Sequence, residues 1–164
     1  MESKRPHPSV IRLFPGWANS PLWIPGGPVD LDDSRLTREL VEDLLAWEAR
    51  YYDTSPQHSS SGSPGSDPGP QERQYLADGK DLTERLAAEL GHSFAVSFES
   101  GREEHYVARS GGSATNPAAA RFFAMEFEEA AAEEERLRGA GPLQAHAPLS
   151  GETFGSDPRD SDRP

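Results

Sequence analysis

The strongest hydrophobic pattern in the chain lies between residues 36 and 52. Apolar side chains recur there at spacings of three and four, which predicts an amphipathic helix with one buried side. Thr37 fits the N-cap of this helix, and Glu39 lies in the first turn, where the helix dipole favours an acidic group. The stripe predicted to face the core consists of Leu36, Leu40, Val41, Leu44, Leu45, Trp47 and Tyr51.

Two further segments have helical patterns. Residues 74–90 place leucines at helical spacing, and Gly91 follows where a C′ glycine would end the helix. Asn116 and Pro117 form a typical helix start, an N-cap followed by proline at N1, and this third helix is predicted to continue to residue 138. Its first half is rich in phenylalanine and is expected to pack on the body. Its second half is rich in glutamate and is expected to project into solvent.

Short apolar runs and alternating patterns predict three strands, at residues 9–14, 93–99 and 105–109. The last two are expected to form a hairpin. We predict that Phe98 lies opposite Tyr106 and that Val96 lies opposite Ala108, because this register puts both sets of side chains on one face.

These elements predict a single small α/β (α+β) domain. We expect a two-layer sandwich, with about three mostly antiparallel strands covered by two amphipathic helices, plus the acidic C-terminal helix. The domain covers residues 9–138 after a disordered lead-in at 1–8. A run of Ser, Pro, Gly and Gln predicts a flexible linker at 54–70 that interrupts the domain, and residues 139–164 are predicted to be a disordered tail. A domain boundary at 54–70 is less favoured, since neither half alone has enough apolar residues for a core.

Composition narrows the classes of partner. The formal net charge is -12, and the acidic residues are spread along the chain, so its field repels nucleic acid and anionic membranes. No cysteine is present, which excludes disulfides, thiolate nucleophiles and cysteine-ligated metal sites. No apolar run approaches the roughly 20 residues of a membrane span, so we expect a cytoplasmic protein.

No motif in the chain is typical of catalysis or cofactor binding. The five histidines lack metal-ligand spacing, and His92 and His105 are expected at different ends of the predicted hairpin. The serine- and glycine-rich stretches match neither a nucleophile elbow nor a phosphate-binding loop. We therefore expect no catalytic residue, no metal site and no cofactor.

Two groups of residues are candidates for partner binding. The aromatic group consists of Trp17 and Trp23 in an irregular apolar segment and of Trp47, Tyr51 and Tyr52 near the end of the first helix. These rings form either part of the core or an aromatic binding patch, since Trp and Tyr dominate interface hot spots.

The acidic group lies on the third helix and consists of Glu129, Glu133 and Glu134. It is either a solvated helix face or a surface offered to a basic protein partner. The sequence leaves the oligomeric state open.

Three stretches of the sequence resemble a family of small uncharacterised actinobacterial proteins. They are IRLFPGWANSPLW, RLTRELVEDLLAWEARYYD and DLTERLAAELG with FAVSF, and the resemblance covers about Ile11 to Phe98. It implies a small cytosolic α/β domain and supplies no established activity. The long linker, the extended acidic helix and the tail depart from the family's pattern.

The favoured hypothesis is a non-enzymatic soluble interaction protein with an immunity-like or antitoxin-like role, using its acidic or aromatic surface. It depends on the absence of a catalytic motif and on exposed acid that would oppose a basic toxin. The alternative is a small-molecule-binding protein or minor enzyme with an aromatic pocket near Trp17, Trp23 and Trp47. A toxin gene beside this one would favour the first hypothesis, and a metabolic operon the second.

Overall fold

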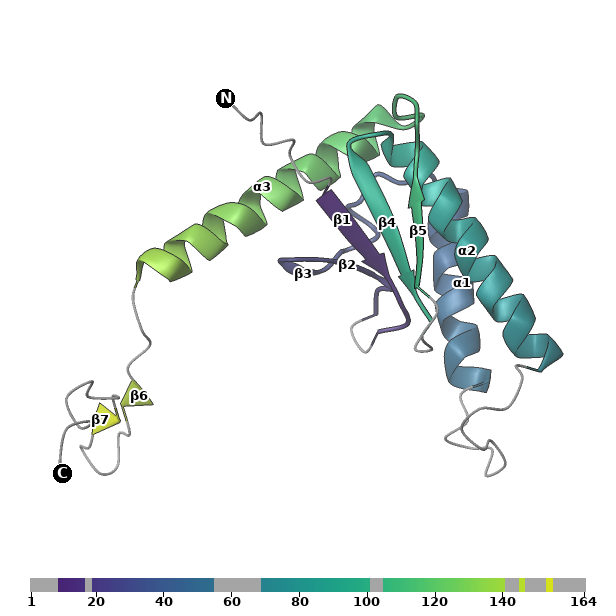
Figure 1. Ribbon diagram of the computed structural model, residues 1–164, viewed down its shortest axis with the longest axis horizontal. Helices are drawn as coiled ribbons and strands as arrows, with labels where there is room; N and C mark the ends of the chain where they lie inside the picture. Colours follow the sequence, from purple (N-terminus) through teal and green to yellow (C-terminus); the bar gives the residue numbers. More distant parts are fainter. Residues whose placement is uncertain are drawn as a thin grey trace, which may run out of the picture. The chain divides into compact units, whose positions relative to one another are not determined.

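Five strands form one sheet in the order β3-β2-β1-β4-β5 (Figure 1). In the middle of the sheet, β1 and β4 run parallel, with Ile11 beside Val96 and Leu13 beside Phe98. The other pairs, β1–β2, β2–β3 and β4–β5, are antiparallel. The strands are β1 (Ser9–Leu13), β2 (Leu22–Ile24), β3 (Gly27–Pro28), β4 (Phe94–Glu99) and β5 (His105–Arg109).

The computed structural model describes residues 9–16, 19–54, 69–100 and 105–140, and the backbone of 145–146 and 153–154. The chain divides into two units, residues 1–131 and 132–164. The first unit contains the five-stranded sheet. In the second unit, β6 (Ala145–His146) pairs antiparallel with β7 (Thr153–Phe154).

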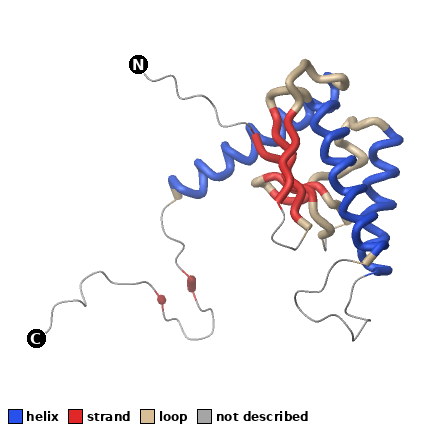
Figure 2. The backbone as a smooth tube through the Cα atoms, turned by 45° about the vertical axis from the view of Figure 1, so that its right-hand side comes forward, coloured by secondary structure: helices blue, strands red, loops and turns tan. Residues whose placement is uncertain are grey.

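Two helices, α1 (Arg38–Thr54) and α2 (Pro70–Leu90), lie side by side and cover one face of the sheet (Figure 2). The core fills the space between these layers. Trp47 of α1 is fully buried there, stacks on Tyr75 with ring centroids 4.6 Å apart, and meets the edge of Phe98 at 5.7 Å. Its Nε1–H donates a 3.0 Å hydrogen bond to the Tyr75 carbonyl, so its polar atom is satisfied.

Gly79 allows α2 to approach the sheet closely. A Cβ atom at this position would lie 2.6 Å from Cζ of Phe98, inside any normal contact distance. The glycine in the helical stripe is therefore a packing feature of the core.

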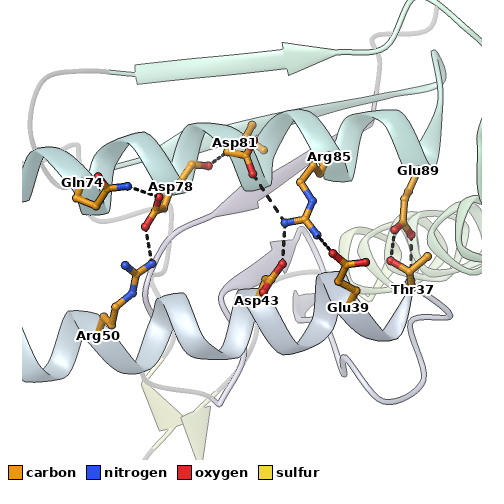
Figure 3. A network of polar contacts seen from close by, with 11 residues as sticks. Thr37, Glu39, Asp43, Arg50, Gln74, Asp78, Asp81, Arg85 and Glu89 are labelled. Atoms are coloured by element: carbon orange, nitrogen blue, oxygen red, sulfur yellow. Dashed lines mark hydrogen bonds and ion pairs between the residues drawn. The ribbon is translucent and has the colours of Figure 1, made fainter.

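Ion pairs join the outer sides of α1 and α2 (Figure 3). Arg85 of α2 lies 2.7 Å from Asp43 of α1, and Arg50 of α1 lies 2.8 Å from Asp78 of α2. Thr37 donates its hydroxyl and its backbone N–H to the carboxylate of Glu89. Thr37 thus precedes the helix as predicted, but its side chain joins the two helices.

The third helix, α3 (Pro117–Gly139), begins where the sheet and the helices meet. Asn116 accepts a 3.2 Å hydrogen bond from the N–H of Ala119 and donates to Glu89 at 2.9 Å, so it caps α3 and ties its start to α2. Phe123 is fully buried, and its ring meets Phe94 of β4 edge-on. The phenylalanine-rich half of α3 therefore packs on the body, as predicted.

The fold class and the hairpin register are confirmed, since β4 and β5 pair Phe98 with Tyr106 and Val96 with Ala108. The predicted number of strands, about three, is too low. Leu22–Ile24 and Gly27–Pro28 extend the sheet through a tight turn in the segment predicted to be irregular. The first strand ends at Leu13, and α2 begins at Pro70, four residues before the predicted start.

The predicted lead-in and most of the predicted linker and tail lie outside the described residues, apart from β6 and β7.

Candidate functional site

The sheet has a second face, opposite α1 and α2. Side chains of a strand alternate between the two faces, and the register aligns the alternate residues of neighbouring strands. Val10 lies beside Ala95 and Arg12 beside Ser97, while Ser97 lies opposite Val107 and Ala95 opposite Arg109. We call this surface the open face; it consists of Val10, Arg12, Phe14, Trp23, Ala95, Ser97, Glu99, His105, Val107 and Arg109.

An ion pair and two aromatic rings contact one another at one side of the open face. Arg12 donates two hydrogen bonds to the carboxylate of Glu99, from Nε at 2.8 Å and from a terminal nitrogen at 2.7 Å. The guanidinium carbon lies 4.9 Å from the centroid of Phe14, whose ring stacks on Trp23 at 5.4 Å. The hydrogen bond from Arg12 lowers the pKa of Glu99, so the pair stays ionised at neutral pH. We call these four residues the Arg12 cluster.

Ser97 and His105 form a second polar contact on this face, with Oγ and Nε2 2.6 Å apart. Glu99 lies opposite His105 in the register, so a serine, a histidine and an acid come together. Both carboxylate oxygens of Glu99 are engaged by Arg12, however, and Ser97 is 3% exposed. The arrangement therefore fixes side-chain positions and does not present a serine nucleophile with an oriented base.

The middle of the open face is an apolar strip. Val10 of β1 and Val107 of β5 are each 43% exposed and flank two small residues of β4, Ala95 and Ser97, which are 0% and 3% exposed. Arg109 lies at one end of the strip and is exposed. Exposed apolar side chains beside a charged margin are typical of protein interaction sites.

A buried carboxylate lies near the end of β1. Glu48 of α1 is 6% exposed and accepts a 3.4 Å hydrogen bond from the N–H of Gly16. Tyr52, one turn further along α1, donates its hydroxyl to the Gly16 carbonyl. Burial raises the pKa of Glu48, because removal from water disfavours the charged form. Trp23 Nε1 is also buried and has no hydrogen-bond partner in the described part of the chain.

The structure separates the predicted aromatic group. Trp47 lies in the core on the helix side, whereas Trp23 belongs to the open face. Tyr51 and Tyr52 lie at the end of α1 and are 36% and 48% exposed. Trp17 lies outside the described residues. Two hollows in the described part of the chain are not lined by a tryptophan: one of about 470 Å³ adjoins Leu45, and one of about 410 Å³ lies between α2 and β5.

The predicted acidic group lies along α3. Glu133 pairs with Arg136 at 3.0 Å and Glu134 pairs with Arg138 at 2.6 Å, one turn further on. Glu129 is exposed. Arg136 and Arg138 of α3 therefore neutralise part of the negative charge of its glutamates.

The sequence pattern does not mark Arg12, Phe14 and Val107 as candidates for a site. Their signal is weak: an arginine and an exposed valine at alternate positions of short strands are compatible with any sheet. Only the pairing of β1 with β4, which joins Arg12 to Glu99 across 87 residues, brings the group together.

Within the described ranges, no group of three or more His, Asp or Glu side chains is placed to hold a metal ion. In the same ranges, no helix has the length and hydrophobicity needed to cross a membrane.

Comparison with known proteins identifies a family. No curated protein and no solved structure matches the chain. A family model described as Serratia CdiI immunity protein-like matches residues 9–101, which run from the start of β1 past the end of β4 and include α1 and α2. The match covers more than half of the 164 residues. The chain therefore belongs to the Serratia CdiI immunity protein-like family.

Proposed function

We propose that the protein is an immunity protein that binds a protein toxin and neutralises it by occupying its surface, without catalysing a reaction. Membership of the CdiI immunity protein-like family carries this proposal, because the match includes the middle of the sheet and both covering helices. Immunity proteins of this kind bind a toxin partner. The interlocked side chains of the open face support a binding role over a catalytic one.

The charge distribution supports a basic region on the toxin. The chain carries a net charge of -12, and Glu129, Glu133 and Glu134 are among its exposed acids. A field of this sign accelerates the approach of a positively charged partner over a distance of about 10 Å at moderate salt. We propose that the acidic half of α3 contributes to this attraction, although its internal ion pairs reduce the local charge.

The test is protection from a toxin encoded beside this gene. Expression of the toxin alone should arrest growth, and expression of both proteins should restore it. The two purified proteins should form a stable complex in size-exclusion chromatography. A toxin that remains fully active in the presence of excess protein, with no complex formed, would reject the proposal.

The contribution of α3 is tested by changing Glu129, Glu133 and Glu134 to Gln. We expect unchanged thermal stability, a slower association with the toxin and a weaker dependence of the association rate on salt. The control changes Glu39 and Glu42 to Gln and Asp81 to Asn, which removes the same charge from α1 and α2. Equal slowing by both triple variants would show that attraction depends on total charge and not on α3.

A further inference from the structure

We propose that the toxin docks on the open face of the sheet, where an apolar segment of the toxin covers Val10 and Val107 and a toxin carboxylate pairs with Arg109. This inference rests on the proposed function and names the surface through which that function operates.

The apolar strip of the open face is exposed to solvent. Val10 and Val107 are each 43% exposed, and they lie on either side of β4, whose buried Ala95 and Ser97 are too small to cover them. Covering β-branched side chains removes apolar surface from water without loss of much side-chain entropy, since their rotamers are already restricted. The strip is therefore suited to contact with another apolar surface.

The charge of the open face differs from that of the chain as a whole. The described residues of β1, β4 and β5 carry Arg12 and Arg109 against one acid, Glu99, and also His105. Arg12 is paired with Glu99, whereas Arg109 makes no ion pair with a described residue and is exposed. The charge balance on the outer sides of α1 and α2 is the opposite of that on the open face. Three carboxylates lie there within 4 Å of the single guanidinium of Arg85: Glu39, Asp43 and Asp81. The open face thus favours a carboxylate on the partner.

Several side chains of the open face are held in place before a partner binds. The Arg12 guanidinium is held by two hydrogen bonds and by the Phe14 ring, and Phe14 is held by Trp23. His105 is held by Ser97. Side chains that are fixed before binding lose little conformational freedom on association, so more of the contact energy appears as affinity. Arg and Trp are also the residues that most often dominate interfaces.

The toxin domain is the partner that covers the open face. Its binding to this protein then has two stages. The overall negative field attracts a basic toxin from a distance and sets the association rate. The apolar strip and Arg109 then hold it, which governs the dissociation rate.

The experiment compares Val107→Glu, Arg109→Glu and the control Leu45→Glu in the full-length chain. Leu45 of α1 is also 43% exposed, so the control adds the same charge at an equally exposed apolar site outside the sheet. Affinity for the purified toxin is measured by titration calorimetry, and protection by growth of cells that express the toxin. Thermal midpoints verify that each variant is folded.

We expect Val107→Glu and Arg109→Glu each to weaken toxin binding by about tenfold or more, as loss of a central interface contact does, and Leu45→Glu to change it by less than about twofold. The Arg109 variant changes a solvent-exposed side chain, so it decides the question if Val107→Glu fails to fold.

Other results would overturn the inference in distinguishable ways. If the unaltered protein binds the toxin and both sheet variants bind equally well, the docking site is elsewhere and the proposed function stands. A loss confined to Leu45→Glu would place the toxin on α1 beside the 470 Å³ hollow. A dimer of the free protein that Val107→Glu dissociates would show that a second copy occupies the face. If the unaltered protein does not bind the toxin, the proposed function fails and the docking assignment fails with it.

Discussion

The two faces of the sheet beside strand β4 differ in what surrounds them. On one face, Val96 and Phe98 are 0% and 1% exposed and pack under the helices. On the other, Ala95 and Ser97 are buried as well, at 0% and 3% exposed, but the flanking Val10 and Val107 are each 43% exposed. On the neighbouring strand β5, a shift of one residue, from Ala108 at 7% to Val107 at 43% exposed, moves a side chain from the core to the proposed docking surface. Substitutions on the first face should act on stability, and substitutions on the second on recognition.

The largest expected effect comes from the core side. Trp47→Ala should lower the free energy of unfolding by about 3 to 5 kcal/mol, because it leaves a large cavity and removes the hydrogen bond to the Tyr75 carbonyl. Urea unfolding followed by circular dichroism measures this change. The control is Trp23→Ala on the open face, which should cost clearly less. Equal losses for the two tryptophans would break the comparison between the faces.

A smaller effect is expected where α2 touches the sheet. Gly79→Ala adds a methyl group 2.6 Å from Phe98 Cζ, so Phe98 or the helix must shift. Overpacking of this kind typically costs about 1 to 3 kcal/mol, which exceeds the gain of about 1 kcal/mol from alanine in a helix. The measurement is the shift in urea midpoint. A stabilised Gly79→Ala variant would show that the contact is looser than described.

The buried carboxylate gives a prediction that depends on pH. The folded-state pKa of Glu48 lies above the unfolded value of about 4.3, so folding favours its protonated form. Stability is then retained below pH 4 and falls as the pH rises through the folded pKa. Glu48→Gln keeps an acceptor for the Gly16 N–H and should be more stable than the unaltered protein at pH 7, with no difference at pH 3.5. Thermal melts at the two pH values test this, and an unstable Gln variant at pH 7 would contradict it.

The smallest expected effect on stability lies on the open face. The Arg12–Glu99 pair is partly exposed, with side chains 52% and 34% accessible, and exposed ion pairs contribute about 1 kcal/mol or less. A double-mutant cycle with Arg12→Gln and Glu99→Gln should yield a coupling energy in this range that decreases with salt. A coupling energy of several kcal/mol would assign the Arg12 cluster to the stability of the fold.

The sequence predicts the parts of this fold that depend on local periodicity. The hairpin register followed from the alternation of Phe98 and Val96, and the C-terminal end of α2 followed from Gly91, whose φ of 78° suits glycine. The strands at Leu22–Ile24 and Gly27–Pro28 were not predicted, since each is too short for an alternating pattern.

The candidate site was less predictable than the fold, because local periodicity does not show which distant strands pair. Its residues come from strands that are distant in sequence, and Arg12 gives no indication of its partner until β1 and β4 are paired. The separation of Trp23 from Trp47 likewise depends on which face of the sheet each ring occupies, and no spacing along the chain contains that information.

The position of β1 has a consequence for folding kinetics. This strand lies near the N-terminus, yet it is the middle strand of the sheet, and its partner β4 is far along the chain. During synthesis, the ribosome must release the chain through residue 98 before β1 and β4 can pair. Until then β1 has no partner strand at this edge, although α1 and α2 can already form. Contacts of such sequence separation slow folding, because a long loop must close before they form. We expect the refolding rate to be sensitive to changes within residues 9–13 and the unfolding rate to be much less so.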